Sequence, residues 1–269
     1  MAGESIVLGD ITLNHTIDGD ADNPWLILSN SLATDLSMWA PQIETLTATH
    51  RVLRYDTRGH GASSVPEGPY DFDMLVADVI SLMDALDIEK ADFMGLSLGG
   101  MTALGLALDH GHRINRIICC DARADAPDMY KQMWPHMISR AQQNGMNGIA
   151  EQTLTRWFSE RFREDETNIN VIVSTGDMIR NTPVEGYVSC ANALMELDYL
   201  PRLGEISVPS LYIVGEFDPA APAEVMQAMA DATPGSQFEM IRGAAHLANL
   251  EDPDKFNEIV SGWLAKDQA

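Results

Sequence analysis

The chain has 269 residues, of which 45% are hydrophobic, and its formal net charge is −23. This length suits one large α/β domain, or one domain with an insertion, better than two equal domains. The acidic balance excludes nucleic acid and anionic membrane surfaces as favourable partners, and no segment approaches the roughly 18 consecutive apolar residues of a membrane span.

The beginning of the chain lacks the features of a secretory signal. Residues 1–11 have no basic start and no long apolar stretch, so we expect a cytoplasmic protein without a signal peptide. The three cysteines, Cys119, Cys120 and Cys190, are too few and too irregularly spaced for a zinc site or a disulfide framework. Because Cys119 and Cys120 lie in an apolar run, we expect them to be buried thiols.

Short apolar runs alternate with helix-period stretches along much of the chain. Residues 5–17 are predicted to form an antiparallel hairpin, and further strands are predicted at 24–30, 50–56, 90–97 and 114–122. Residues 71–88 form the clearest helix, since apolar side chains recur on one face of it. They are Phe72, Leu75, Val76, Val79, Leu82, Met83 and Leu86. With two later strands, this order predicts an α/β fold with a mainly parallel sheet of eight strands flanked by helices.

A G-x-S-x-G motif, Gly95-Leu96-Ser97-Leu98-Gly99, lies between the strand at 90–97 and a helix of small residues at 99–108. A sharp strand-to-helix turn of this kind is a nucleophile elbow, which presents a serine hydroxyl to a pocket. Its glycines are needed because the neighbouring backbone comes too close to the serine for a Cβ. The alternative is that Gly99 and Gly100 only let the helix pack closely on the sheet, with Ser97 as a bystander.

The alternation of strands and helices stops after residue 122. From 123 to 197 the pattern is helical, and strands resume at 209–218 and 236–242. Breaks between the helices are predicted at 145–148, 168–170 and 181–183. We therefore expect a core domain made of residues 1–122 and 198–269. Residues 123–197 are expected to be an all-helical cap over the carboxyl ends of the strands, where ligands bind in open α/β sheets.

A nucleophilic serine needs a histidine base that an acid orients, and after an elbow the chain order is serine, acid, histidine. Of the seven histidines, His246 is the one that lies far beyond Ser97 and just past a strand. Two aspartates, Asp121 and Asp218, follow strands on the correct side of Ser97. Asp218 is favoured because one helix and one strand separate it from His246, a connection that brings neighbouring strand ends together. Asp121 remains the alternative acid.

Two backbone N–H groups are expected to form an oxyanion hole, which stabilises the negative charge of an acyl-transfer intermediate. One is the N–H of Leu98, directly after the nucleophile and at the start of a helix. The other should come from the loop at 30–33, which follows the strand at 24–30. We favour the N–H of Leu32 over that of Ser31.

Five stretches of the chain match a known family of proteins: residues 28–39, 53–63, 95–101, 156–158 and 246–251. With these stretches the chain resembles the 3-oxoadipate enol-lactonases of the α/β-hydrolase superfamily. The first contains Ser29-Asn30-Ser31-Leu32, where many relatives in the superfamily have His-Gly in place of Asn30-Ser31. The resemblance implies a catalytic triad of Ser97, Asp218 and His246, and oxyanion donors at Leu32 and Leu98. It also implies a helical cap with a pocket tryptophan, which Trp134 matches best. Trp134 and Ser31 are therefore the expected substrate-binding residues, with packing inside the cap as the other interpretation of Trp134.

The chain departs from that family in two places. Ala33 and Leu98 stand where glycine and methionine are commoner, and residues 123–182 of the cap match least well. The family's substrate carries a carboxylate, which a chain of net charge −23 attracts poorly without a local cation. Arg123, Arg140 and Arg156 are the cations available on the cap side, and the sequence leaves the choice among them open.

We expect a serine hydrolase that opens a lactone or small carboxylic ester, with 3-oxoadipate enol-lactone as the first substrate. We expect no cofactor and no metal, since no His, Asp or Glu pair has ligand spacing. The same scaffold could instead act on an acyl-homoserine lactone, another ester or a carbon–carbon bond, or form peracids. A small-molecule receptor of the same fold is a further alternative. A monomer and a homodimer are both compatible with the sequence.

Overall fold

The computed structural model describes residues 3–267. The expectations for residues 1–11 and for the ends of the core segments 1–122 and 198–269 therefore extend partly outside the described residues. Within residues 3–267, no helix is long and apolar enough to cross a membrane.

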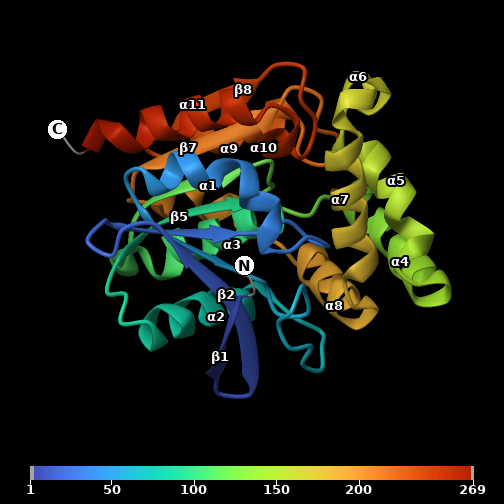
Figure 1. Ribbon diagram of the computed structural model, residues 1–269, viewed down its shortest axis with the longest axis horizontal. Coiled ribbons are helices and arrows are strands. Elements are labelled where there is room, and N and C mark those ends of the chain that lie inside the picture. Colours follow the sequence, from blue (N-terminus) through green and yellow to red (C-terminus); the bar gives the residue numbers. More distant parts are fainter. Residues whose placement is uncertain (1–2, 268–269) are drawn as a thin grey trace.

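An eight-stranded sheet forms the centre of the molecule, in the order β1-β2-β4-β3-β5-β6-β7-β8 (Figure 1). Its strands are β1 (Glu4–Leu8), β2 (Ile11–Asp18), β3 (Trp25–Ser29), β4 (Arg51–Tyr55), β5 (Ala91–Leu96), β6 (Ile114–Cys120), β7 (Ser210–Gly215) and β8 (Gln237–Ile241). Strand β2 pairs antiparallel with β1 and β4, and the strands from β4 to β8 are parallel neighbours. The predicted α/β fold with a mainly parallel sheet is confirmed.

Helices cover the sheet because its central strands are apolar on both faces. Every residue of β5 and β7 is buried, which is typical of parallel strands covered on both sides. The covering helices are α1 (Ala40–Thr47), α2 (Phe72–Ala85), α3 (Leu98–Asp109), α9 (Ala223–Ala232), α10 (Ala248–Glu251) and α11 (Pro253–Leu264). Helix α1 packs against α11 and helix α2 against α3. The predicted helix at 71–88 begins where the Asp71 side chain accepts the Met74 N–H, and it ends three residues early, at Ala85.

Helix α3 lies deep in the molecule because two glycines in its first turn let it approach the sheet closely. A Cβ on Gly99 would collide with the carbonyl of Ser29 in β3, and one on Gly100 would lie 2.7 Å from the Cβ of Ala122. Close packing is thus one reason for these glycines.

Five α-helices lie between β6 and β7. They form what we call the helical segment, at one end of the sheet (Figure 1). They are α4 (Asp128–Asn144), α5 (Asn147–Trp157), α6 (Glu160–Glu164), α7 (Ile169–Asn181) and α8 (Val184–Met195). The two connecting stretches that join this segment to the core run side by side. They are linked by hydrogen bonds from Ala126 N–H to Leu197 O and from Tyr199 N–H to Ala124 O.

Two of the predicted breaks between these helices are found, and one is wrong. The interruptions at 145–146 and 182–183 fall within the predicted breaks. The break predicted at 168–170 lies instead at Asp165, whose side chain accepts the Thr167 N–H and starts a short 3₁₀ turn that leads directly into α7. A further break, at 158–159, was not predicted; there the Ser159 side chain accepts the Phe162 N–H and starts α6.

Candidate active site

Ser97 occupies a strained turn between β5 and α3. Its φ is 56° and its ψ is −112°, a region that residues other than glycine seldom adopt. A Cβ on Gly95 would collide with the backbone carbonyl of Gly99, which explains the first glycine of the motif. The turn is held by the hydrogen bond from Ser97 N–H to Cys120 O, at 2.8 Å, and by that from Gly99 N–H to Asn30 O, at 3.0 Å. The nucleophile candidate is therefore fixed by the backbone on both sides.

His246 and Asp218 meet at the carboxyl end of the sheet. His246 Nδ1 lies 2.8 Å from Asp218 Oδ2, and both side chains are buried. Asp218 Oδ1 accepts a second hydrogen bond from Ala220 N–H, at 2.7 Å. Because an ionised carboxylate can only accept, the proton of a neutral imidazole lies on Nδ1 and Nε2 is left as an acceptor. Asp218 follows β7 and His246 follows β8, two parallel neighbours in the sheet.

The loop that carries His246 is tied to the helical segment by residues that were not singled out as site residues. Leu247 N–H donates to Trp157 O at 3.1 Å, and the Trp157 ring lies 6.0 Å from the imidazole. The Glu251 carboxylate accepts Ala245 N–H at 3.0 Å and also accepts the N–H and hydroxyl of Ser159. The only sequence signal for Trp157 and Glu251 is that both fall within matched stretches, at 156–158 and 246–251.

Ser97 and His246 line one small cavity of about 50 Å³. Its other walls include Ser31 and Leu32 from the loop after β3, and Tyr130, Trp134, Arg156 and Trp157 from the helical segment. Drug-sized ligands usually occupy pockets of roughly 300–1,000 Å³, so this cavity is closed around a very small space. A more open groove of about 830 Å³ lies between residues 65–69, α4 and α8. It contains neither Ser97 nor His246, so we take the small cavity as the candidate site.

The loop after β3 is anchored by Asn30. The Asn30 amide donates to Tyr55 O at 3.0 Å and accepts the Trp39 indole N–H at 3.1 Å. Leu32 lines the cavity, and Leu98 is the first residue of α3. Across residues 3–267 neither of their N–H groups donates a hydrogen bond, so both remain able to receive an oxyanion. The fixed position of Asn30 gives a physical reason for the Ser-Asn-Ser-Leu form of this loop.

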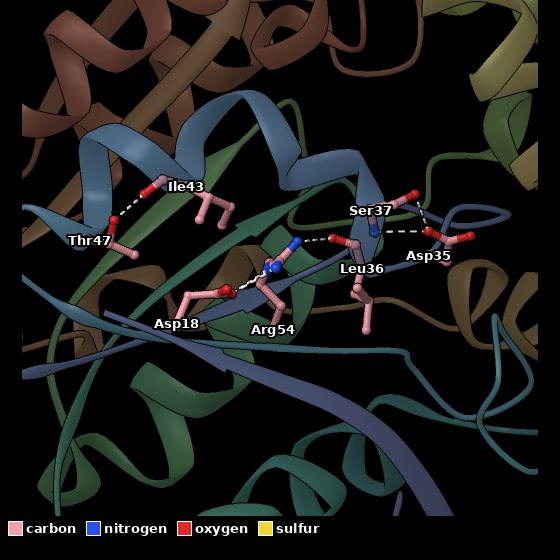
Figure 2. A network of polar contacts seen from close by, with 7 residues as sticks. All are labelled: Asp18, Asp35, Leu36, Ser37, Ile43, Thr47 and Arg54. Carbon is pink, nitrogen blue, oxygen red and sulfur yellow. Dashed lines mark hydrogen bonds and ion pairs between the residues drawn. The ribbon is translucent and has the colours of Figure 1, made fainter. Parts of the chain in front are cut away.

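The far end of the same loop is tied to the sheet (Figure 2). Arg54 of β4 forms an ion pair with Asp18 of β2, at 2.7 Å, and also donates to Leu36 O at 3.4 Å. The Asp35 side chain accepts Ser37 N–H at 2.8 Å and starts the following helical turn. Both ends of the oxyanion loop are thus held before any substrate arrives.

The three candidate arginines differ in the partners that their guanidinium groups contact. Arg123 contacts Asp125 and the carbonyl of Ala220, and Arg140 contacts Gln152 and the carbonyl of Gly148. Arg156 lines the cavity, and its Nη1 lies 3.0 Å from Met133 Sδ. Thioether sulfur is a weak acceptor, and within the described part of the chain Arg156 has no carboxylate partner.

The two expected substrate-binding residues both face the cavity. Trp134 lines it and also packs edge-on against Tyr130, with ring centroids 5.7 Å apart. Its indole N–H and the Ser31 hydroxyl are buried and have no hydrogen-bond partner among residues 3–267. Trp134 therefore packs within the helical segment and also forms part of the cavity wall, which is compatible with both interpretations of this residue. Burial raises the pKa of the Tyr130 and Tyr187 phenols, so the aromatic wall is uncharged.

Other residues singled out in the sequence have structural positions. The alternative acid, Asp121, accepts Gly215 N–H at 2.8 Å, whereas His246 is bound to Asp218. Cys119, Cys120 and Cys190 are free, buried thiols, as expected for the first two. No cluster of His, Cys, Asp and Glu suited to a metal ion occurs in residues 3–267.

Comparison with known proteins places this geometry in a family. The model of the family described as "alpha/beta hydrolase fold" matches residues 24–253. The chain is 40% identical to 3-oxoadipate enol-lactonase 2 of Acinetobacter baylyi, over 98% of this chain and 97% of that protein. The crystal structure of the enol-lactonase from Burkholderia xenovorans LB400 superimposes with a TM-score of 0.94, at 38% identity, covering 98% of this chain and 100% of that one. A thermophilic esterase from Thermogutta terrifontis has a TM-score of 0.90, at 30% identity, covering 99% of this chain and 98% of that one. The resemblance to 3-oxoadipate enol-lactonases is confirmed.

Proposed function

This chain belongs to the alpha/beta hydrolase fold family, and on that basis we propose that it is a serine hydrolase that opens the ester bond of a lactone. The proposed substrate is 3-oxoadipate enol-lactone or a close analogue, because relatives matching nearly the whole chain carry that activity in their names. The observation that carries the proposal is the hydrogen bond between His246 and Asp218 at a cavity that Ser97 also lines.

In the proposed reaction, the Ser97 hydroxyl attacks the lactone carbonyl while His246 Nε2 takes its proton. Asp218 holds the ring through Nδ1–H and stabilises the charged imidazolium. The N–H groups of Leu32 and Leu98 receive the oxyanion. No hydrogen bond joins Ser97 and His246 within residues 3–267, but such contacts are commonly long without substrate and tighten when it binds.

Collapse of the intermediate breaks the ring C–O bond, and His246 returns its proton to the leaving oxygen. Because the substrate is cyclic, the leaving group stays attached to the acyl chain on Ser97. Water then attacks the acyl-enzyme with His246 as base, and the acid product leaves. No step in this sequence requires a cofactor.

Arg156 is the residue that we propose receives the carboxylate of the substrate. It is the cavity-lining member of the three candidate cations, and within residues 3–267 its guanidinium contacts only the weak acceptor Sδ of Met133. The repulsion from a net charge of −23 is screened beyond about 8 Å at physiological salt, so the charge nearest the ligand dominates. Trp134 and Ser31 are proposed to contact the rest of the substrate.

We further propose that residues 123–197 act as the cap over the site. A cavity of about 50 Å³ holds only a few water molecules, so the wall must give way for a lactone to bind. The helical segment joins the core through the two adjacent connecting stretches at 124–126 and 197–199. The cytoplasmic location and the oligomeric state remain predictions.

The proposal is tested by turnover assays on the purified protein with a panel of substrates. We expect the highest kcat/KM with 3-oxoadipate enol-lactone, above that for an acyl-homoserine lactone, aryl acetates and a vinylogous diketone. Ser97→Ala should lower kcat on the order of 10⁶-fold while circular dichroism shows an unchanged fold. Turnover retained by Ser97→Ala would contradict the serine mechanism.

A small carboxylic ester is the second candidate substrate. It is favoured by the 30% identity to an esterase over nearly the whole chain and by the largely apolar cavity wall. A kcat/KM for aryl acetates above that for the enol-lactone would support this second activity. Saturable binding of the lactone without product, followed by mass spectrometry, would instead indicate a receptor.

A further inference from the structure

Asp121 is a buried carboxyl group that the proposed reaction does not use. It follows β6, next to the end of β7, and its side chain is entirely shielded from solvent. Its φ is 47°, in the left-handed region, where a non-glycine residue is strained unless its surroundings hold it. Its Oδ1 accepts Gly215 N–H at 2.8 Å, while its Oδ2 has no donor within residues 3–267. A strained, buried acid with an unpartnered oxygen needs a physical explanation.

The neighbour that this carboxyl group reaches is another acid. Asp121 and Asp218 follow the neighbouring strands β6 and β7, and both side chains are buried. The charge of Asp218 raises the pKa of Asp121. Two ionised carboxylates repel strongly in a buried environment, so the pair is stable when it holds one proton. That proton then forms the hydrogen bond that the unpartnered oxygen of Asp121 otherwise lacks.

The hydrogen-bond donors around the two acids decide which of them keeps the proton. Asp218 accepts from His246 Nδ1–H on one oxygen and from Ala220 N–H on the other, and both favour its charged form. Among residues 3–267, Asp121 accepts a hydrogen bond from Gly215 N–H alone. Arg123, two residues further on, directs its guanidinium to Asp125 and to the carbonyl of Ala220. The proton therefore belongs on Asp121.

We propose that Asp121 is a positioning residue that stays protonated in the folded protein and donates a hydrogen bond to the Asp218 carboxylate. This contact would hold that carboxylate in the orientation in which it meets His246. The role in catalysis rests on the proposed function, whereas the protonation of Asp121 does not.

Most of the groups around Asp121 favour its neutral form, and the N–H of Gly215 favours its charged form. Burial raises its pKa well above the usual range, and the charges of Asp218 and Glu251 raise it further, while Gly215 N–H acts in the opposite direction. The thiols of Cys119 and Cys120 precede it on β6, and burial raises their pKa so that they carry no charge. His246 faces the pair from the far side of Asp218.

Infrared difference spectroscopy tests the protonation without any substrate. Wild-type protein minus Asp121→Asn at neutral pH should show the carbonyl band of one protonated carboxylic acid. The matched control is Asp92→Asn, which removes a buried carboxylate paired with Arg116 and should leave that band unchanged. Absence of the band in the wild-type difference would overturn the proposal, whatever the enzyme's activity.

The pH dependence of stability provides an independent test. An aspartate in the unfolded chain releases its proton above a pH of about 4, whereas the folded protein is proposed to keep the proton on Asp121. Because folding then takes up a proton, the free energy of unfolding falls as the pH rises. Asp121→Asn removes this dependence, because its amide is neutral in both states and keeps a donor for Asp218. The gain in Tm of Asp121→Asn over wild type should therefore be larger at about pH 8 than at about pH 5. An equal difference at both values would contradict the proposal.

The positioning role is tested by comparing two substitutions. Asp121→Asn should keep kcat within about threefold and leave the acidic limb of the kcat/KM profile in place, since no charge is lost. Asp121→Leu should lower kcat by about 10- to 100-fold, as is usual when a partner of a functional ligand is removed. A shift of the acidic limb by about one pH unit in Asp121→Asn would show that a negative charge had been removed, and would refute the proposal. Ser97→Ala tests the proposed function separately.

Discussion

The core and the helical segment build opposite walls of one cavity by different means. On the core side, Ser97 is held by a strained backbone and two main-chain hydrogen bonds, and Asp218 and His246 stand at neighbouring strand ends. On the other side, Trp134 and Arg156 project from helices whose backbones make no part of the proposed chemistry. The core wall is specified by backbone geometry, while the helical wall is specified by individual side chains.

This difference assigns separate roles to the two walls. A backbone turn can hardly change without losing the site, whereas a side chain on a helix can be exchanged at little structural cost. The chemical step should therefore depend on the core, and the choice of substrate should depend on the helical segment. The predictions below test that division.

The largest effect is expected from His246→Ala. Removal of the base should lower kcat on the order of 10⁶-fold, and by the same factor for the enol-lactone and for a neutral aryl acetate, because both need the same proton transfer. Steady-state kinetics on the two substrates measure this. His136→Ala, on an exposed face of α4, is the control and should retain full activity. A loss confined to one substrate would contradict a purely chemical role for the core.

The opposite pattern is expected from Arg156→Gln in the helical segment. Loss of a charge-assisted hydrogen bond should lower kcat/KM for a substrate that carries a carboxylate by about 10- to 100-fold. The value for a neutral aryl acetate should stay within about threefold of wild type.

The control for this prediction is Arg140→Gln. Arg140 belongs to the same segment but is bound to Gln152 and the carbonyl of Gly148, so both substrates should be unaffected. If Arg156→Gln lowers the rates for acidic and neutral substrates equally, then Arg156 supports the wall and does not recognise charge.

The sequence predicted the core wall better than the helical one, and the reason is physical. The positions of the strands along the chain follow from apolar periodicity, and Ser97 lies in a motif whose glycines answer a local steric need. Both signals can be read within a few residues. The pairing of His246 with Asp218 follows from their places at the ends of successive strands.

The features that escaped prediction depend on partners that are distant in the sequence. The break at Ser159 is stabilised by Glu251, which lies 92 positions further on. Whether Arg123, Arg140 or Arg156 faces the cavity depends on how helices rotate against the core, which spacing does not determine. The misplaced break at 168–170 is the exception, since its cause is local: the cap formed by Asp165 starts a turn that continues into α7.

The contact between the core and the helical segment can be tested by a substitution at Gly186 in α8. This residue of α8 packs on the backbone of Gly59 in the core, and a Cβ on Gly186 would collide with the Gly59 carbonyl. Gly186→Ala should therefore push α8 outward and lower the free energy of unfolding by about 1–3 kcal/mol. Denaturant titration measures this. Gly262→Ala, in α11 where a Cβ meets open space, should be neutral or slightly stabilising. Equal effects of the two variants would show that close packing at Gly186 is unimportant.

The smallest effect is expected at Ala33, where the backbone of the core wall is strained. Ala33 has a φ of 61° and is buried next to Leu32, in a conformation that favours glycine. The left-handed conformation costs a non-glycine residue about 1–2 kcal/mol, and the added flexibility of an unfolded glycine offsets roughly 0.5–1 kcal/mol of that. Ala33→Gly should therefore stabilise the protein by about 0.5 kcal/mol, measured as a higher denaturant midpoint with an unchanged slope. Ala124→Gly, at a buried loop alanine whose φ lies outside the left-handed region, should destabilise instead. If both substitutions destabilise alike, the oxyanion loop is not strained at Ala33, and the core wall owes its rigidity to hydrogen bonds such as those of Asn30 alone.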